Sequence, residues 1–358
     1  MQNNIRIPDS EFKERVVKIQ EKMAETGYDM LLCYGNEAEP QFVRYFSDYW
    51  PSFETAGVII PIKGEAKLLI GPESYTYAAD RSRISDIRLV KSFRESSEPE
   101  YPGKPLDTFT SIFKDCLGDA PIKKFGVAGL PLLTVGIYND LMEHLKPYGN
   151  VVIEKADDVV ASIRMYKTEN ELACMRKAAE ITRATMEYVI NNIHVGMTET
   201  QVVGLALGKM HELGAERESY PLWVLTGDGS DQAISRPRNK VIKEGDLTFL
   251  QIGARYEGYA STIGRPVVFG KATPDQKALI EAGYEVQRSV LEITKAGVPA
   301  SEVAKFHLNK VKELGFEDHY LLSYDKKSRN QRLKIFLNNG DKLFFAYAKS
   351  LIKADIFF

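Results

Sequence analysis

The 358 residues exceed what one hydrophobic core usually spans, which predicts two domains, and a content of 44% hydrophobic and 27% charged residues is typical of globular proteins. A formal net charge of −2 provides neither the basic field of a nucleic-acid-binding protein nor an acidic tail. The sequence contains no signal-peptide core and no run near the ~20 apolar residues of a membrane helix, so we expect a cytoplasmic protein with no nucleic-acid and no membrane partner.

The first half of the chain alternates between short apolar runs and helical patterns. Apolar residues recur at helical spacing over residues 10–25, and Gly27 follows them as a helix stop. One further helix is expected to open near residue 107 and another to end near residue 144. Strands are expected at residues 30–33, 57–62, 66–70, 87–90, 124–127 and 151–153. This alternation predicts an α/β domain over residues 1–157, with a mixed sheet covered by helices.

From residue 158 the pattern changes to long helices around one strand-rich stretch. Thr168 with Glu171, and Thr198 with Gln201, form capping boxes, in which the hydroxyl accepts from an early backbone N–H group and the third residue reaches back. Two more helices are expected over residues 273–297 and 299–315. The strand-rich stretch, residues 222–269, is where we expect the chemistry of a second domain over residues 158–322, which an atypical tail follows at 323–358.

Several short phrases in this half share their order and spacing with one known family. They are Arg164, Lys167 and Glu171, then Gly196, Met197 and Thr198, then Gly245 and Asp246, then residues 252–254, Gly258, Tyr259, Ser261, Arg265 and Gly270, and finally residues 296–298. Together they resemble the creatinase, prolidase and aminopeptidase P family. The resemblance implies an α/β N-terminal domain followed by an α+β domain of the pita-bread fold, a homodimer, and a small-molecule or short-peptide substrate.

The resemblance also locates a departure. Peptidases of this family hold two divalent metal ions with five side chains, and the first two are aspartates on adjacent strands. The corresponding phrases carry Gln251 and Thr262 here. A neutral amide and a hydroxyl cannot offset the cost of removing water from two divalent cations. The other ligands, one His and two Glu, are expected beyond about residue 322, where the sequence has neither. We therefore expect no metal site, no cofactor and no metal-activated hydroxide.

Residues 323–358 are rich in Lys, Asn and Phe and do not resemble the closing strands of the family. Two interpretations stay open. One is a truncated or frame-shifted end, which would leave the pita-bread domain incomplete at its C-terminal end and expose strand edges. The other is an authentic but divergent tail that completes the sheet by another route.

The catalytic residues stay unknown. Creatinase itself lacks the metals and hydrolyses a C–N bond with a His as general acid and base. The loop that should carry this His, residues 226–240, contains none, and Ala233 lies near the expected place. General acid–base work needs a titratable group near the operating pH. The carboxylates of the region are more typical of solvated loops than of catalysts; they are Glu218, Asp228, Asp231 and Glu257.

Five residues are candidates for substrate binding. Arg236 and Arg265 have the guanidinium geometry that clamps a carboxylate bidentately, although Arg265 equally suits a structural ion pair. Gln251 and Thr262 could bind a polar ligand where the family binds metal, or they could form a neutral hydrogen-bonded plug. Tyr259 belongs to the frame of the same pocket.

An aromatic cluster in the first domain admits two interpretations. Tyr45, Tyr49, Trp50 and Phe53 follow Arg44 closely. The resemblance implies that such a loop contributes to the substrate pocket of the neighbouring subunit in a dimer. The alternative is that the rings are simply packed, because aromatic side chains supply a large buried area.

The sequence thus predicts a hydrolase-like member of the creatinase, prolidase and aminopeptidase P family. We expect it to be metal-independent and to act on a C–N bond of a small amide, amidine or peptide-like substrate. The alternative is a catalytically inactive homologue that serves as a binding or dimerisation module, because fold does not imply function. A His or carboxylate that converges on Gln251 and Thr262 would favour hydrolysis, and its absence would favour binding.

Overall fold

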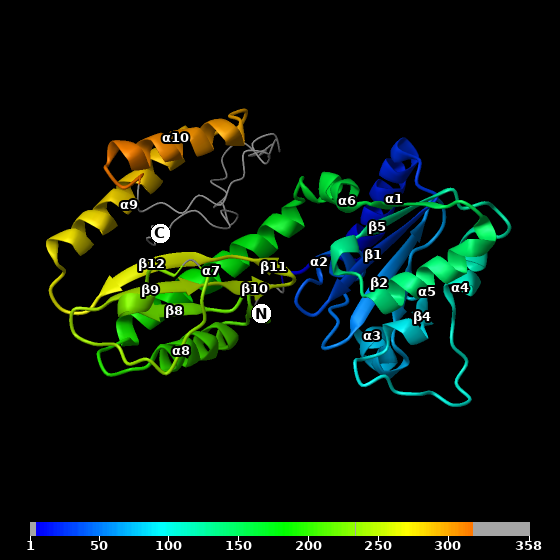
Figure 1. The fold of residues 1–358 in the computed structure, drawn as a ribbon, viewed down its shortest axis with the longest axis horizontal. Coiled ribbons are helices and arrows are strands. Elements are labelled where there is room, and N and C mark those ends of the chain that lie inside the picture. The colour runs from blue at the N-terminus through cyan, green and yellow to red at the C-terminus, as the bar shows by residue number, and fades with distance from the viewer. Residues whose placement is uncertain (1–4, 233, 318–358) are drawn as a thin grey trace. The chain divides into compact units, whose positions relative to one another are not determined.

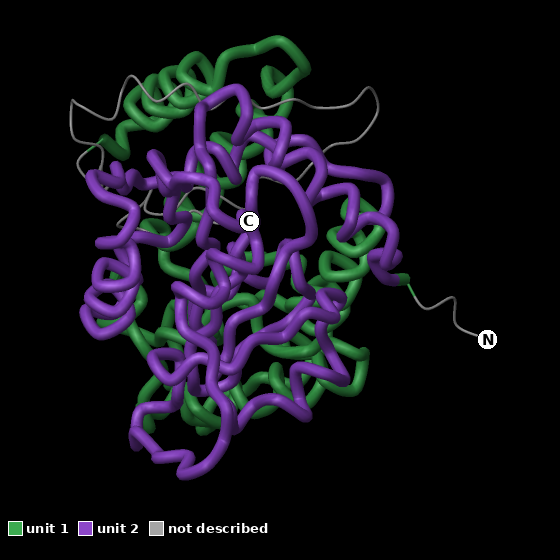
Figure 2. The backbone as a smooth tube through the Cα atoms, turned by 90° about the vertical axis from the view of Figure 1, so that its right-hand side faces the viewer, with its two compact units in different colours: residues 1–5, 171–358 green, residues 6–170 purple. Residues whose placement is uncertain are grey.

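A computed structural model describes residues 5–232 and 234–317, which divide into two compact units (Figures 1 and 2). One unit comprises residues 6–170, and the other comprises residues 1–5 and 171–358. The expected domain boundary after residue 157 stays a prediction. Ala233 and the tail at 323–358 lie outside the described residues, so the two interpretations of the tail also stay open.

Residues 6–170 form an α/β unit in which helices flank a central sheet (Figure 1). The sheet has six strands in the order β4-β3-β2-β1-β5-β6. Strand β1 pairs antiparallel with β2 and parallel with β5, so the sheet is mixed, as the alternation of elements predicts. The strands are β1 (Met30–Asn36), β2 (Thr55–Pro61), β3 (Lys67–Ile70), β4 (Ile87–Leu89), β5 (Lys124–Ala128) and β6 (Val152–Lys155).

Helices cover both faces of this sheet because successive residues of the central strand point to opposite sides. Leu31 and Cys33 of β1 belong to one apolar cluster, whereas Leu32 and Tyr34 belong to the other. The first cluster packs on α1 (Asp9–Thr26), α2 (Gln41–Ser47), α3 (Tyr75–Arg81) and α6 (Asp157–Arg164), and the second on α4 (Phe109–Leu117) and α5 (Val135–Leu145). The helix stop at Gly27 is confirmed, since its φ of 77° is left-handed.

Three helices of this unit were not expected from the sequence. They are α2, α3 and α6, and each has only seven or eight residues. Two turns are too few for a helical apolar period to stand out from a strand or loop pattern. Their positions are set by contacts with the sheet rather than by a local signal, because they pack on one face of it through residues such as Phe46, Ala78 and Val160.

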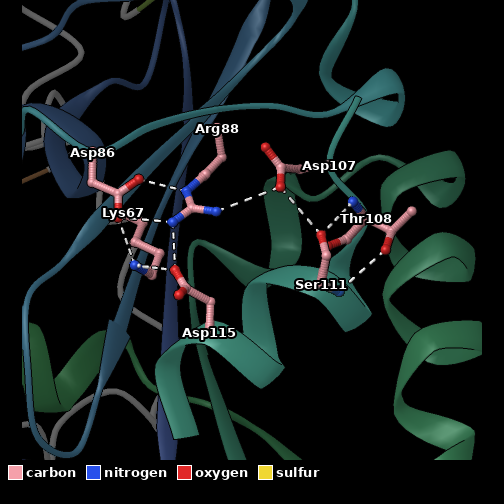
Figure 3. Close-up of polar contacts among 7 residues, drawn as sticks. All are labelled: Lys67, Asp86, Arg88, Asp107, Thr108, Ser111 and Asp115. Atoms are coloured by element: carbon pink, nitrogen blue, oxygen red, sulfur yellow. Dashed lines mark hydrogen bonds and ion pairs between the residues drawn. The ribbon is translucent and has the colours of Figure 1, made fainter. Parts of the chain in front are cut away.

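A network of side-chain ion pairs connects strands β3 and β4, at the edge of this sheet, to α4 (Figure 3). Lys67 of β3 places its Nζ 2.6 Å from Asp86 Oδ2 and 2.8 Å from Asp115 Oδ2, with its side chain only 9% exposed. Arg88 of β4 pairs with the same two carboxylates and reaches Asp107 at 3.5 Å. Two buried or half-buried cations thus share three carboxylates that come from different elements.

Within its described residues, the other unit contains two small antiparallel sheets and four α-helices. One sheet has the order β12-β9-β8 and the other β11-β10-β7. The strands are β7 (Arg217–Glu218), β8 (Trp223–Thr226), β9 (Leu247–Ile252), β10 (Ala254–Tyr256), β11 (Tyr259–Ala260) and β12 (Ile263–Val268). The helices are α7 (Glu169–Asn192), α8 (Glu199–Glu212), α9 (Pro274–Ile293) and α10 (Ala300–Glu313). The expected strand-rich stretch is therefore confirmed.

Helices α7 and α8 cover one face of the β12-β9-β8 sheet. Met186 of α7 and Val202 of α8 share an apolar cluster with Val224, Leu250 and Ile252 of the strands. The capping box at the start of α8 is confirmed, with both of its reciprocal hydrogen bonds present. Helix α9 ends at Ile293, four residues earlier than expected, because the backbone at the next residue is extended. No helix in the described part of the chain is long and apolar enough to cross a membrane.

The ion network predicts that the stability of the α/β unit depends on pH. Burial alone would raise the pKa of Asp86, but hydrogen bonds from Arg88 and Lys67 lower it below its ordinary value. The hydrogen bond from Lys67 likewise lowers the pKa of Asp115. The unfolded chain therefore binds more protons than the folded one near the ordinary carboxyl pKa of about 4. Stability from the network is present above that pH and is lost as the pH falls through the lowered values.

Asp86→Asn should destabilise the unit by about 1–3 kcal/mol at pH 7, the range for hydrogen bonds to charged groups. Urea unfolding followed between pH 3 and 7 measures this, and the difference from wild type should shrink toward the acid end. Asp80→Asn is the matched control, because the Asp80 side chain is 71% exposed. An Asp86→Asn effect that is constant across this pH range would contradict the assignment.

Candidate functional site

The candidate site lies where β9 meets β12 and β8. Gln251 is opposite Gly264 of β12 and Trp223 of β8. Side chains alternate along a strand, so Gln251 points away from the face on which its neighbours Leu250 and Ile252 pack with α7 and α8. Thr262 lies two residues before Gly264 and therefore shares the face of Gln251 as its diagonal neighbour. The two residues singled out from the sequence thus face the same side.

Tyr220 joins these two residues. Its hydroxyl lies 2.5 Å from Thr262 Oγ1, and the Gln251 side chain is near enough to the phenol to act on its pKa. Burial raises the pKa of Tyr220 well above its ordinary value, although the polar side chains of Thr262 and Gln251 act to lower it. The phenol therefore stays neutral across the physiological range. The ring of Trp223 packs edge-on against it, with centroids 6.0 Å apart. The site is therefore a group of uncharged polar side chains next to the packed rings of Tyr220 and Trp223.

Sequence reasoning missed Tyr220. It precedes β8 by three residues, in a position where an aromatic side chain is usually a core residue. Its hydroxyl meets Thr262 across a sequence separation of 42 residues, so no local pattern could have revealed the contact. The only available signal was its closeness to the strand that pairs with Gln251.

Close approach of the backbone at Gly253 makes this convergence possible. The N–H of Ser219 donates to the carbonyl of Gly253 at 2.8 Å. A Cβ at position 253 would lie 2.1 Å from Ser219 Oγ and 2.4 Å from the carbonyl oxygen of Ser261, closer than atoms can approach. Only glycine fits between these segments, and the segments carry Tyr220 and Thr262.

Two polar atoms around the site are enclosed without partners. Gln251 Oε1 and Ser219 Oγ are buried and make no hydrogen bond within the described structure. A buried acceptor that lacks a donor costs about 1–3 kcal/mol. Both atoms are enclosed by the protein, so this cost is borne by the packing around the site.

A buried carboxylate holds the loop that follows β8. Glu199 is fully buried, and its two oxygens accept from the backbone N–H groups of Thr226 at 2.8 Å and Arg238 at 2.7 Å. Asp228 within this loop is exposed and paired with Lys240, which lowers the pKa of its carboxyl. The loop expected to carry a catalytic His is therefore anchored at both ends, and Asp228 is a solvated carboxylate.

The remaining candidates make other contacts. Arg265 is opposite Leu250 and so lies on the opposite face of the sheet from Gln251. Its Nη1 donates to the carbonyl of Gly264 at 2.7 Å, and burial lowers its pKa. The Tyr259 hydroxyl donates to Glu171 Oε1 at 2.8 Å. Arg236 is exposed. A role of these three residues in substrate binding stays a prediction.

The aromatic cluster of the α/β unit divides into packed and exposed members. Tyr45 and Tyr49 are buried, and Trp50 donates its indole N–H to the carbonyl of Glu37 at 2.9 Å. Packing therefore accounts for these rings. Phe53, in contrast, is 73% exposed.

The donor set at the site does not fit the two metal ions that the family resemblance implies. Gln251, Thr262 and Tyr220 offer one amide and two hydroxyls, whereas divalent cations of this kind require carboxylate charge. Across the described residues, no three or more His, Cys, Asp or Glu side chains gather in a way that could hold a metal ion. We therefore derive no step through a metal.

Comparisons with known proteins agree across both units. The model of the creatinase/prolidase N-terminal domain matches residues 15–166, and that of metallopeptidase family M24 matches residues 173–326. The Xaa-Pro dipeptidase of Pyrococcus furiosus is 27% identical over 312 residues, covering 87% of this chain and 80% of the relative. The Xaa-Pro dipeptidase of Pyrococcus horikoshii is 29% identical over 310 residues, covering 86% and 79%.

Solved structures show the same likeness. The prolidase from Pyrococcus horikoshii OT3 superposes with a TM-score of 0.70 at 25% identity, covering 86% of this chain and 80% of the other. The X-Pro aminopeptidase from Thermotoga maritima has a TM-score of 0.71 at 22% identity, with coverages of 85% and 79%, and it shows the fold alone.

The backbone approach at Gly253 can be tested with paired glycine substitutions. Gly253→Ala should destabilise the unit by about 1–3 kcal/mol through overpacking against Ser219 and Ser261. Gly208→Ala on α8 is the control, because a Cβ there meets nothing within 4 Å. It should stabilise the helix by about 0.5–1 kcal/mol. Chemical denaturation of both variants measures the two effects, and equal effects would contradict the close packing at residue 253.

Proposed function

The chain belongs to the creatinase, prolidase and aminopeptidase P family, with a creatinase-type N-terminal domain before a pita-bread domain, and from this premise we propose a metal-independent hydrolase. Its substrate is a small amide, amidine or short peptide, and the bond it cleaves is a C–N bond. The observation that carries the proposal is the neutral group of Gln251, Tyr220 and Thr262 in place of a carboxylate pair.

The chemistry of the site supports this substrate class. Amide and hydroxyl groups recognise uncharged polar ligands by hydrogen bonds, and their partly buried setting strengthens each bond relative to water. The Xaa-Pro dipeptidases among the relatives are named for a peptide substrate, which is itself an amide. We assign no catalytic residue.

A second candidate is a catalytically inactive homologue that binds the same class of ligand. One observation favours it. The Thr262 hydroxyl pairs with the Tyr220 hydroxyl, and in the described structure no side-chain hydrogen bond of Gln251 or Thr262 goes to a His or a carboxylate. A binding protein needs no general base, whereas a hydrolase does.

Turnover assays decide between the two candidates. The full chain is treated with a chelator, dialysed and incubated with Xaa-Pro dipeptides and with small amides, and product release is followed by chromatography. Turnover that survives chelation supports the hydrolase. Turnover that appears only after manganese, cobalt or zinc is added contradicts it. Ligand binding without turnover, in the presence or absence of metal, identifies the binding module.

Restoring the carboxylates should create affinity for divalent cations. We expect wild type to bind no stoichiometric manganese, because the site offers neutral donors, whereas Gln251→Asp combined with Thr262→Asp should bind at least one ion. Titration calorimetry with manganese chloride measures both. Thr200→Asp on the exposed start of α8 controls for an added surface charge. Two ions bound per wild-type chain would mean that other side chains supply a metal site.

The expectations of a homodimer and of a cytoplasmic location remain proposals. They rest on the family resemblance and on the composition of the chain, and the exposed Phe53 is a candidate contact in a dimer. The solution mass from light scattering checks the first, and fractionation of cells checks the second.

A further inference from the structure

We propose that the first turn of helix α7 is a junction that couples the stability of the two units, held by Glu11 in one unit and by Tyr259 in the other. The division of the chain falls inside this helix, because α7 begins at Glu169 whereas the α/β unit ends at Asn170. Domain boundaries usually fall in exposed, flexible linkers. A boundary inside a continuous helix instead joins the units through hydrogen-bonded backbone.

Glu11 of α1 binds the start of α7 within the α/β unit. Its Oε1 accepts from the Thr168 hydroxyl at 3.0 Å, and its Oε2 accepts from Asn170 Nδ2 at 3.0 Å. Hydrogen bonds to an ionised group are stronger than those between neutral groups. The positive end of the helix dipole also favours a carboxylate beside the first turn. The start of α7 is therefore attached to α1 by two charge-assisted hydrogen bonds.

A buried cation fixes the Glu11 carboxylate in place. Arg15, one turn later on α1, donates from Nη2 to Glu11 Oε1 at 2.8 Å, and both side chains are buried. Arg15 Nη1 donates to the carbonyl of Tyr45 at 2.8 Å, and the guanidinium carbon lies 4.2 Å from the centroid of the Tyr45 ring. Separating a buried ion pair would leave both charges uncompensated. Glu11 therefore stays directed at the start of α7.

Glu171 attaches the same turn of α7 to the other unit. It is buried, and its Oε1 accepts from the Tyr259 hydroxyl at 2.8 Å. Tyr259 begins β11, which pairs with β10, and Thr262 of the candidate site follows shortly after this strand. Asn170 and Glu171 are adjacent in the chain. The hydrogen bonds made within each of the two units thus meet in one turn of α7.

Units that share one helical turn cannot unfold independently without disrupting it. Unfolding of the α/β unit breaks the hydrogen bonds of Glu11 and frays the first turn of α7, which carries the hydrogen bond between Glu171 and Tyr259. Unfolding of the other unit removes the helix that holds Thr168 and Asn170 in place. Each unit should therefore lose stability when the other is destabilised, and the coupling is reciprocal.

Fluorine NMR can follow the two units separately in the full chain, because each unit contains one of the two tryptophans. After labelling with 5-fluorotryptophan, Trp50 reports on the α/β unit and Trp223 on the other. Asp86→Asn weakens the ion network of the α/β unit, so it should lower the urea midpoint at Trp50 by about 0.5–1 M. Coupling predicts a similar shift at Trp223. An unchanged midpoint at Trp223 overturns the inference, and this comparison needs no change at the junction.

Removing the two donors to Glu11 should uncouple the units. Thr168→Val combined with Asn170→Ala does this and leaves the ion pair of Glu11 within α1 in place. In that background the ion-network variant should still lower the midpoint at Trp50, whereas the midpoint at Trp223 should stay unchanged. A Trp223 shift as large as in the wild-type background overturns the inference.

A substitution in the other unit gives an independent measure. Tyr259→Phe removes the hydroxyl that donates to Glu171 and keeps the ring, so it should likewise suppress the shift at Trp223. Asn192→Ala is the matched control, because this exposed side chain donates to the carbonyl of Tyr188 at the far end of α7. Loss of coupling in the control also overturns the inference. No ligand enters these measurements, so their outcome is separate from that of the proposed function.

Discussion

The hydrogen bond between Tyr220 and Thr262 is the interaction on which the site depends. It draws together the segment before β8 and the start of β12, and Gln251 of β9 completes the group. The register of the strands places Gln251 and Thr262 on one face, and the absence of a side chain at Gly253 lets the backbones approach. The scaffold thereby brings an amide and two hydroxyls together.

The two units use polar side chains for different ends. In the α/β unit, Lys67 and Arg88 form ion pairs with carboxylates from neighbouring segments. These pairs compensate both charges and stabilise the edge of the sheet. Around Gln251, in contrast, the groups are neutral, and the enclosed Gln251 Oε1 has no hydrogen-bond partner in the described structure. A buried polar atom without a partner is costly, whereas the ion pairs of the α/β unit compensate one another.

Much of the fold and part of the site could be predicted from the sequence. Alternation of strands and helices predicted the α/β unit, and the capping box at Thr198 marked the start of α8 to the residue. The departures from the family pattern at Gln251 and Thr262 were visible because both residues lie within short motifs whose order and spacing match the family. Tyr220 and Glu199 were not found, since their partners lie 42 and 27 or more residues away and depend on tertiary packing. That Arg265 and Gln251 lie on opposite faces of the sheet likewise could not be predicted without the strand register.

The most direct test of the account is the hydroxyl pair of Tyr220 and Thr262, observed by NMR on the wild-type protein. The account predicts that a hydroxyl proton of this pair exchanges slowly with water, and that the Tyr220 ring shows a nuclear Overhauser contact with the Thr262 methyl group. Tyr220→Phe should abolish the protection. Rapid exchange of both hydroxyl protons, with no contact between the two side chains, would contradict the account.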